Sequence, residues 1–151
     1  MTTTTGKPET ATATEELVLR SRDGGVHILT LNDANSRNSL SAAMLAQLQK
    51  AITSLAARKE VRVIVIAASG PAFCSGHNLK ELSLMRKEPD GGRSSFNRLM
   101  TQCSTLMQSL IKCRKPVIAA VEGIATAAGC QLVATCDLAV ASASAQFCTP
   151  G

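Results

Sequence analysis

A nearly continuous run of β-branched residues constrains the fold of this chain more than any other segment. Residues 61–68 read Val-Arg-Val-Ile-Val-Ile-Ala-Ala, and the run stops at Ser69-Gly70-Pro71. A strand that is apolar on both faces is typical of a parallel sheet covered by helices, because an exposed face would select alternating polar residues. The run therefore predicts a buried strand in a parallel sheet.

The segments around this run alternate between strand-like and helix-like patterns. Strands are predicted at residues 17–21 and 26–31 (a hairpin through Asp23-Gly24-Gly25), 61–68, 117–121 and 137–141, with another beginning at 145–147. Helices are predicted at residues 42–57, capped by Ser41, at 79–86 and 94–112, and from the small-residue segment 125–130 through about residue 135. Residues 32–39 are predicted to be a polar loop. This alternation indicates the α/β class.

Composition narrows the classes of partner. The chain has 151 residues, a net charge of +5, three Phe and neither Tyr nor Trp. Scarce aromatics and dispersed basic residues argue against nucleic-acid binding, which uses stacking platforms or basic stripes. A modest positive charge equally suits a small anionic ligand. No apolar run reaches the roughly 18 residues of a membrane helix, so we expect no membrane span.

The cysteines and the N-terminus bear on metal binding and location. None of the six cysteines forms a CxxC pair, so no metal site is expected. Residues 1–14 are rich in Thr and lack Arg, which predicts a disordered leader before a core at residues 15–151. These features favour the cytoplasm, with the mitochondrial matrix as the alternative.

The C-terminus also carries information. Gly151 follows a strand-like segment directly, without a closing helix. We therefore expect a fold that stops short of its full extent. The alternative is a small domain with a frayed end.

Two loops carry the candidate chemistry. Residues 70–79 and 123–130 each follow a predicted strand and precede a predicted helix. The first N–H groups of a helix lack internal acceptors, and glycine lets a ligand approach the backbone closely. Two such N–H groups converging on one carbonyl oxygen form an oxyanion hole. Taken singly, each loop is explained equally well by a tightly packed turn.

Together, the two loops resemble the signature segments of a known family. Residues 72–81 (Ala-Phe-Cys-Ser-Gly-His-Asn-Leu-Lys-Glu), and residues 115–123 followed by 128–132, are similar to two segments of the crotonase, or enoyl-CoA hydratase/isomerase, superfamily. Residues 37–40, 136–141 and 145–147 extend the likeness from about residue 17 to residue 151. The resemblance implies a ββα superhelix, here truncated before its C-terminal helical part, and an acyl-CoA ligand. It implies no cofactor besides the CoA thioester, and a homo-trimer or hexamer for the full domain.

The resemblance also assigns residues. It implies that the backbone amides of His77 and Ala128 form the oxyanion hole. It places a CoA site along residues 75–80, with Ser75, His77, Asn78, Leu79 and Lys80, together with Arg37 and Ala128. Lys80 is a candidate partner for a CoA phosphate and Arg37 a second one, although each side chain could simply be solvated. An acid–base role for the His77 imidazole is the alternative to its amide role.

Two departures from the family pattern affect the chemistry. Hydratases of this family use two glutamates, and the matching positions hold Gln131 and Gly151. A glutamine can orient water but cannot accept its proton near neutral pH. The chain thus resembles family members that lack the glutamate pair.

Three hypotheses about function follow. The first is a hydratase- or isomerase-like enzyme, and the second is an inactive acyl-CoA-binding or assembly module. The third, an unrelated nucleotide-binding domain, lacks support because no GxGxxG motif is present. Asp137 and His27 are predicted to be structural.

Overall fold

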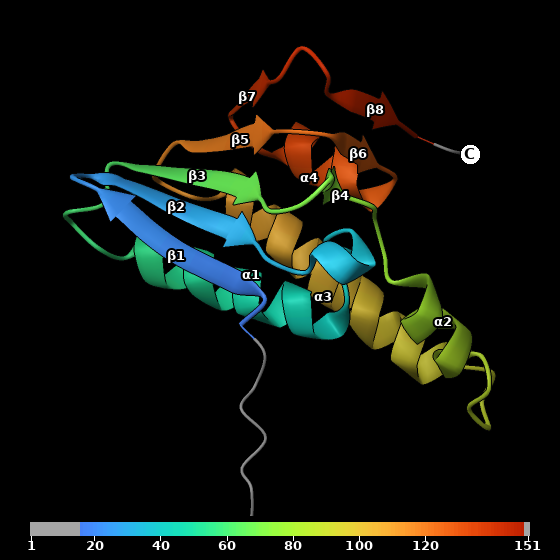
Figure 1. Ribbon diagram of the computed structural model, residues 1–151. Helices are drawn as coiled ribbons and strands as arrows, with labels where there is room; N and C mark the ends of the chain where they lie inside the picture. Colours follow the sequence, from blue (N-terminus) through green and yellow to red (C-terminus); the bar gives the residue numbers. More distant parts are fainter. Residues whose placement is uncertain (1–15, 150–151) are drawn as a thin grey trace, which may run out of the picture.

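The computed structural model describes residues 16–149, which form a mixed α/β fold with two sheets (Figure 1). The strands are β1 (Val18–Asp23), β2 (Val26–Leu31), β3 (Val63–Ala68), β4 (Ala72–Cys74), β5 (Val117–Val121), β6 (Ile124–Thr126), β7 (Leu138–Ala141) and β8 (Gln146–Cys148). The helices are η1 (Ala34–Ser36, 3-10), α1 (Ala42–Ala56), α2 (Leu79–Met85), α3 (Arg93–Ile111) and α4 (Ala128–Thr135). The predicted leader at residues 1–14 and the position of Gly151 lie outside the described residues.

The larger sheet confirms the predicted hairpin and parallel strand. Its order is β1-β2-β3-β5-β7, and every neighbouring pair except β1 with β2 is parallel. The hairpin turns at Gly24, whose φ of +53° suits a residue without a side chain. β3 begins at Val63, two residues later than predicted, because the amides of Arg62 and Val63 both donate to the Gly25 carbonyl at the strand's entry.

Of the smaller sheet, the sequence predicted β8, as a strand beginning at residues 145–147, but not β4 or β6. Its strands β4, β6 and β8 are three residues each and pair in parallel. Each follows a strand of the larger sheet, so the chain repeats a strand–strand unit three times, with helices after the first two (Figure 1). This arrangement is the ββα superhelix that the family resemblance implied.

The core lies between the larger sheet and helices α1 and α3, which cover one face of that sheet (Figure 1). Leu45, Leu48 and Leu106 on the helices and Ile64 and Ile66 on β3 are completely buried. Burying each such side chain contributes about 1.5–3 kcal/mol to stability.

A large apolar side chain of α3, that of Met100, is exposed to solvent. Met100 is 43% exposed, whereas Leu99 and Cys103 on the same helix are buried. Met100 therefore lies at the edge of the helix face that packs into the core, where its side chain remains in contact with solvent.

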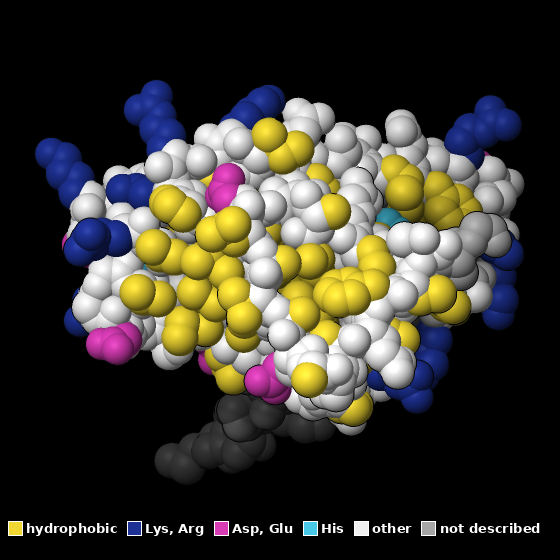
Figure 2. Space-filling model, turned by 90° about the horizontal axis from the view of Figure 1, so that it is seen from above, with side chains coloured by type: hydrophobic (Ala, Val, Ile, Leu, Met, Phe, Trp, Pro, Cys, Tyr) yellow, Lys and Arg dark blue, Asp and Glu magenta, His cyan; other side chains and the backbone are white. Residues whose placement is uncertain are grey.

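The last two strands lie at the surface of the described part of the chain. Every residue of β7 and β8 is exposed, including Leu138 at 62%, Val140 at 66% and Phe147 at 53%. Figure 2 shows apolar side chains gathered in the middle of the face seen from above. Between residues 16 and 149, no helix covers these strands.

A buried asparagine holds the loop after β2. The loop, predicted to lack regular structure, contains one turn of 3-10 helix, η1. Asn38 is fully buried; its side-chain amide donates to the carbonyls of Ser69 and Ala72 at 2.8 Å, and its Oδ1 accepts from the Asp33 amide at 2.8 Å. This one side chain therefore fixes the loop to the segment between β3 and β4.

Replacing Asn38 with Ala should lower the free energy of unfolding by about 3 kcal/mol, because the buried Ala72 carbonyl, the partly buried Ser69 carbonyl and the Asp33 amide lose these hydrogen bonds. Urea denaturation measures the change. Asn35→Ala, an exposed change in the same loop, is the matched control and should stay within about 0.5 kcal/mol of the parent. Equal stability of the two variants would contradict this role for Asn38.

Candidate functional site

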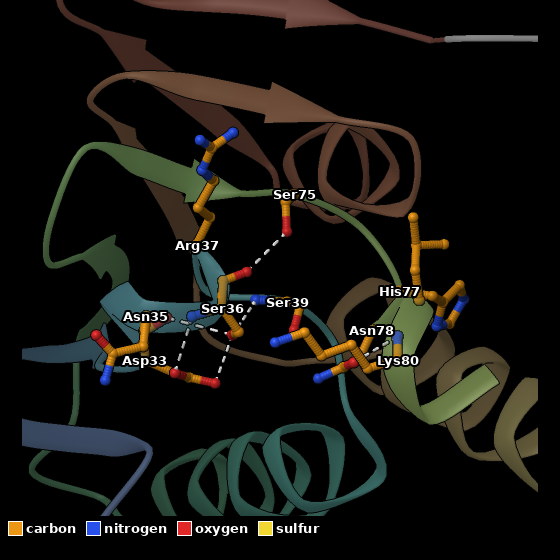
Figure 3. A pocket seen from close by; sticks show the side chains of 10 residues that line it. Asp33, Asn35, Ser36, Arg37, Ser39, Ser75, His77, Asn78 and Lys80 are labelled. Carbon is orange, nitrogen blue, oxygen red and sulfur yellow. Dashed lines mark hydrogen bonds between the residues drawn. The ribbon is translucent and has the colours of Figure 1, made fainter. Parts of the chain in front are cut away.

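A pocket of about 450 Å³ lies between the η1 loop and the start of α2 (Figure 3). Its lining residues are Asp33, Asn35, Ser36, Arg37, Ser39, Ser75, His77, Asn78, Leu79 and Lys80. Six of them are the residues that the family resemblance placed at a CoA site: Arg37, Ser75, His77, Asn78, Leu79 and Lys80. The seventh, Ala128, belongs to the adjoining wall described below.

Backbone hydrogen bonds join the two sides of the pocket. The Leu40 amide donates to the Gly76 carbonyl at 2.7 Å, and the Ser75 amide donates to the Arg37 carbonyl at 3.1 Å. The Ser75 hydroxyl also donates to the Ser36 carbonyl at 3.1 Å. The pocket is therefore built on paired backbone rather than on side chains alone.

Arg37 is presented by an unusual backbone. Arg37 and Asn38 have φ values of 56° and 53°, in the left-handed region that side-chain-bearing residues rarely adopt. The hydrogen bonds of the buried Asn38 side chain hold this conformation. The Arg37 side chain consequently leaves the loop at the edge of the pocket (Figure 3).

The opposite side of the pocket is the first turn of α2. Asn78 caps the helix, because its Oδ1 accepts from the amides of Lys80 and Glu81 at 3.1 Å each. The Glu81 carboxylate accepts from the Ala42 amide at 3.1 Å, which ties α2 to the start of α1. Lys80 is exposed in this first turn and lines the pocket.

The loop before α2 lies directly against the start of α4. A Cβ placed on Gly76 would lie 3.1 Å from the Ala127 Cβ and 3.4 Å from the Ala128 backbone nitrogen. A Cβ on Gly129 would lie only 2.3 Å from the Cys74 carbonyl oxygen. Both contacts follow from the parallel pairing of β4 with β6, and they bring the two predicted loops together.

Among the described residues, no backbone carbonyl accepts from the amides of His77 and Ala128. Neither is a donor in the hydrogen bonds that the loops between residues 16 and 149 make. Ala128 is the first residue of α4, so its N–H has no acceptor within the helix. The preceding residue, Ala127, has φ 51° and ψ −121°, and its own amide donates to the Cys148 carbonyl at 2.9 Å.

Two buried polar atoms of the lining also lack partners in the described part of the chain. These are the Ser39 hydroxyl oxygen and the His77 Nδ1. Buried polar atoms are nearly always hydrogen-bonded, so two unpartnered atoms in the residues of one lining are unusual. Sequence reasoning missed Ser39, because an isolated serine in a polar loop carries no distinguishing signal.

Gln131 lies apart from this pocket. It is exposed on α4 one turn after Ala128, and it is not among the lining residues. Residues separated by three positions share a helix face, so Gln131 and Ala128 lie on the same side of α4.

Cys74, in the signature segment, is not a nucleophile. Burial raises the pKa of its thiol to about 11, although a backbone hydrogen bond with Gly76 acts in the opposite direction. The thiol therefore stays protonated near neutral pH.

Asp137 occupies a structural position, as predicted. Its Oδ2 accepts from the Val117 amide at 2.7 Å, next to the paired strands β5 and β7. Among residues 16–149, no cluster of three or more metal-ligating side chains occurs. No helix in that same range combines the length and apolarity that a membrane crossing requires.

Comparison with known proteins places these loops in a family context. The sequence model for enoyl-CoA hydratase/isomerase matches residues 21–151. Enoyl-CoA hydratase domain-containing protein 3, mitochondrial, of Danio rerio is 46% identical over 135 residues, covering 89% of this chain and 45% of the relative. Its counterpart in Homo sapiens is 45% identical over 127 residues, covering 84% and 40%.

Solved structures agree with the sequence comparison. An enoyl-CoA hydratase of Mycobacterium smegmatis superposes with a TM-score of 0.81 at 52% identity, covering 88% of this chain and 50% of the other. Human enoyl-CoA hydratase domain-containing protein 3 gives a TM-score of 0.82 at 43% identity, with 89% and 51% covered. The chain thus spans about half the length of these relatives.

Replacing Gly129 with Ala should separate α4 from β4, because the new methyl group would collide with the Cys74 carbonyl. We expect a loss of about 2 kcal/mol in unfolding free energy and faster hydrogen exchange at the Gln131 amide, which donates to the Ala127 carbonyl at the start of α4. Urea denaturation and amide exchange by NMR measure the two effects.

The control is Gly91→Ala, which introduces the same methyl group into open space, although at a φ of +67°. It should cost about 1 kcal/mol and leave exchange at the Gln131 amide unchanged. Unchanged exchange in the Gly129 variant would show that the contact does not position α4.

Proposed function

Because the chain belongs to the enoyl-CoA hydratase/isomerase family, we propose that it binds an acyl-CoA thioester and holds the thioester oxygen with the His77 and Ala128 amides. The observation that carries this proposal is the contact between the two loops, where a Cβ on Gly76 would lie 3.4 Å from the Ala128 nitrogen. Gly76 directly precedes His77, so both candidate donors belong to one small region of backbone.

The proposed donors suit an oxygen that gains negative charge. A thioester oxygen becomes an oxyanion when an enolate forms, and fixed N–H groups stabilise it without reorganising. Removing one such donor typically costs about 3–4 kcal/mol of transition-state stabilisation. The N-terminus of α4 adds the positive end of its helix dipole beside Ala128.

The pocket next to these amides supports recognition of the CoA moiety. Lys80 and Arg37 lie on opposite sides of it, and either can pair with a phosphate. Asp33, the acidic residue in the lining, accepts hydrogen bonds at both carboxylate oxygens from Ser36. The Asp33 carboxylate therefore binds donors of its own loop.

The acid–base half of the reaction is a separate part of the proposal. We propose a hydratase-like lyase or isomerase reaction of fatty acid metabolism, in which Gln131 orients a water molecule. Gln131 cannot remove the proton, so the base is ordered water or a residue outside residues 16–149. The second candidate function, binding without turnover, is favoured by the glutamine at this position.

We also propose the cellular and quaternary context from the relatives. The proteins of Danio rerio and Homo sapiens described above carry the word mitochondrial in their names, which favours the mitochondrial matrix over the cytoplasm for this chain. A homo-trimer or hexamer is the assembly that the family implies.

Binding of acetyl-CoA should weaken about fivefold when Lys80 is replaced by Ala, because one charge-assisted contact to a phosphate is lost. Isothermal titration calorimetry measures the dissociation constant. Lys87→Ala, an exposed lysine just after α2 that is absent from the lining, is the matched control. No binding of any CoA ester to the parent chain would overturn the proposed function.

Turnover should respond to the residue at position 131. If Gln131 orients the attacking water, Gln131→Glu supplies a proton acceptor, and hydration of crotonyl-CoA should rise at least about tenfold over the parent. Gln131→Ala, which keeps neither function, should abolish any basal rate. Tight binding with no hydration by the parent and the Glu variant would select the non-catalytic alternative.

A further inference from the structure

A second pocket, of about 370 Å³, lies on the hairpin at the opposite end of β2 from the η1 loop. Its lining residues are Arg20, Ser21, Arg22, His27, Ile28, Leu29, Leu55 and Arg58. None of these residues lines the first pocket. Three guanidinium groups and one imidazole thus surround this pocket, and no Asp or Glu is part of its lining.

The register of the hairpin explains why the basic groups meet. Arg22 pairs across the strands with His27, and Arg20 pairs with Leu29. Directly paired residues of an antiparallel ladder project from the same face. Leu29 is completely buried, so this face is the one that packs on α1, and Arg58 follows the C-terminal end of that helix. The arginines therefore rim a pocket beneath which Leu29 and Leu55 are buried.

His27 is the second, independent sign of a ligand. Its side chain was predicted to be structural, and the residue is indeed only 6% exposed. Its Nε2 is nevertheless buried without a hydrogen-bond partner among the described residues, and the residue lines the pocket. A buried ring nitrogen without a partner is costly unless a ligand supplies one.

The arginines are available to a bound anion. In residues 16–149, the single ion pair joins Arg58 Nε to Glu60 Oε1 at 3.4 Å, with side chains 53% and 58% exposed. An exposed pair of this kind is weak and can exchange its partner. Arg20 and Arg22 take part in no ion pair within that range.

We propose that this pocket binds a phosphate monoester with a small apolar group. The phosphate would pair with the arginines and His27 Nε2, because guanidinium groups recognise phosphate through paired N–H donors. The apolar group would lie on the apolar part of the pocket's lining, above the buried Leu29 and Leu55. The site is separate from the thioester site and does not depend on the proposed function.

Phenyl phosphate is a suitable probe, with inorganic phosphate and benzoate as comparison ligands at pH 8 and constant ionic strength. Calorimetry should show one saturable site for phenyl phosphate, about tenfold tighter than for either comparison ligand. Arg20→Gln should weaken it about tenfold. Arg93→Gln, which removes the same charge from the exposed first residue of α3, should change it less than twofold.

Two further measurements keep the result specific to this pocket. The His27 imidazole resonances should shift on titration with phenyl phosphate, and excess acetyl-CoA should not displace the ligand. The proposal would be overturned if phenyl phosphate shows no saturable binding, or if the Arg20 and Arg93 variants lose the same amount of affinity. It would also be overturned if the His27 resonances do not shift. Benzoate binding as tightly as phenyl phosphate would overturn the assignment to a phosphate group, and equally tight inorganic phosphate would overturn the apolar part.

Discussion

The close approach of α4 to β4 at Gly129 is the contact on which the candidate site depends. The Cys74 carbonyl oxygen occupies the space where any other residue would carry its Cβ. Only this spacing lets the start of α4 reach the loop after β4, where Gly76 and His77 lie. The site is thus made by backbone proximity between successive units of the superhelix, and the side chains around it refine an arrangement that the backbone has already set.

The long helices and strands were predictable because burial of one or both faces sets the spacing of their apolar residues. The apolar spacing of α1 and the continuous run in β3 both reflect packing against the sheet or its helices. β4 and β6 were not predictable in this way. Their sequences, Ala-Phe-Cys and Ile-Ala-Thr, are too short to show alternation. They become strands because β6 pairs with β4 on one side and with β8 on the other.

The residues of the candidate site were named through family resemblance rather than from spacing. Arg37 and Lys80 are far apart in sequence yet line one pocket, which the motifs indicated and local patterns alone did not. Ser39 and the left-handed backbone at Asn38 were missed, because both depend on how a polar loop is fastened to its neighbours. The unpartnered nitrogen of His27 was missed for a related reason: strand periodicity predicts burial but not whether a buried polar atom finds a partner.

The hydrogen bond from Ala127 to Cys148 has a consequence for the motions of the molecule. Ala127 occupies a backbone conformation that typically costs about 1–3 kcal/mol, and such conformations persist only where surrounding contacts enforce them. One enforcing contact comes from β8, a three-residue strand that is exposed throughout. Local opening of β8 would remove this contact from Ala127, the residue directly before the Ala128 amide. The local unfolding of β8 and the backbone conformation at Ala127 are therefore parts of one equilibrium.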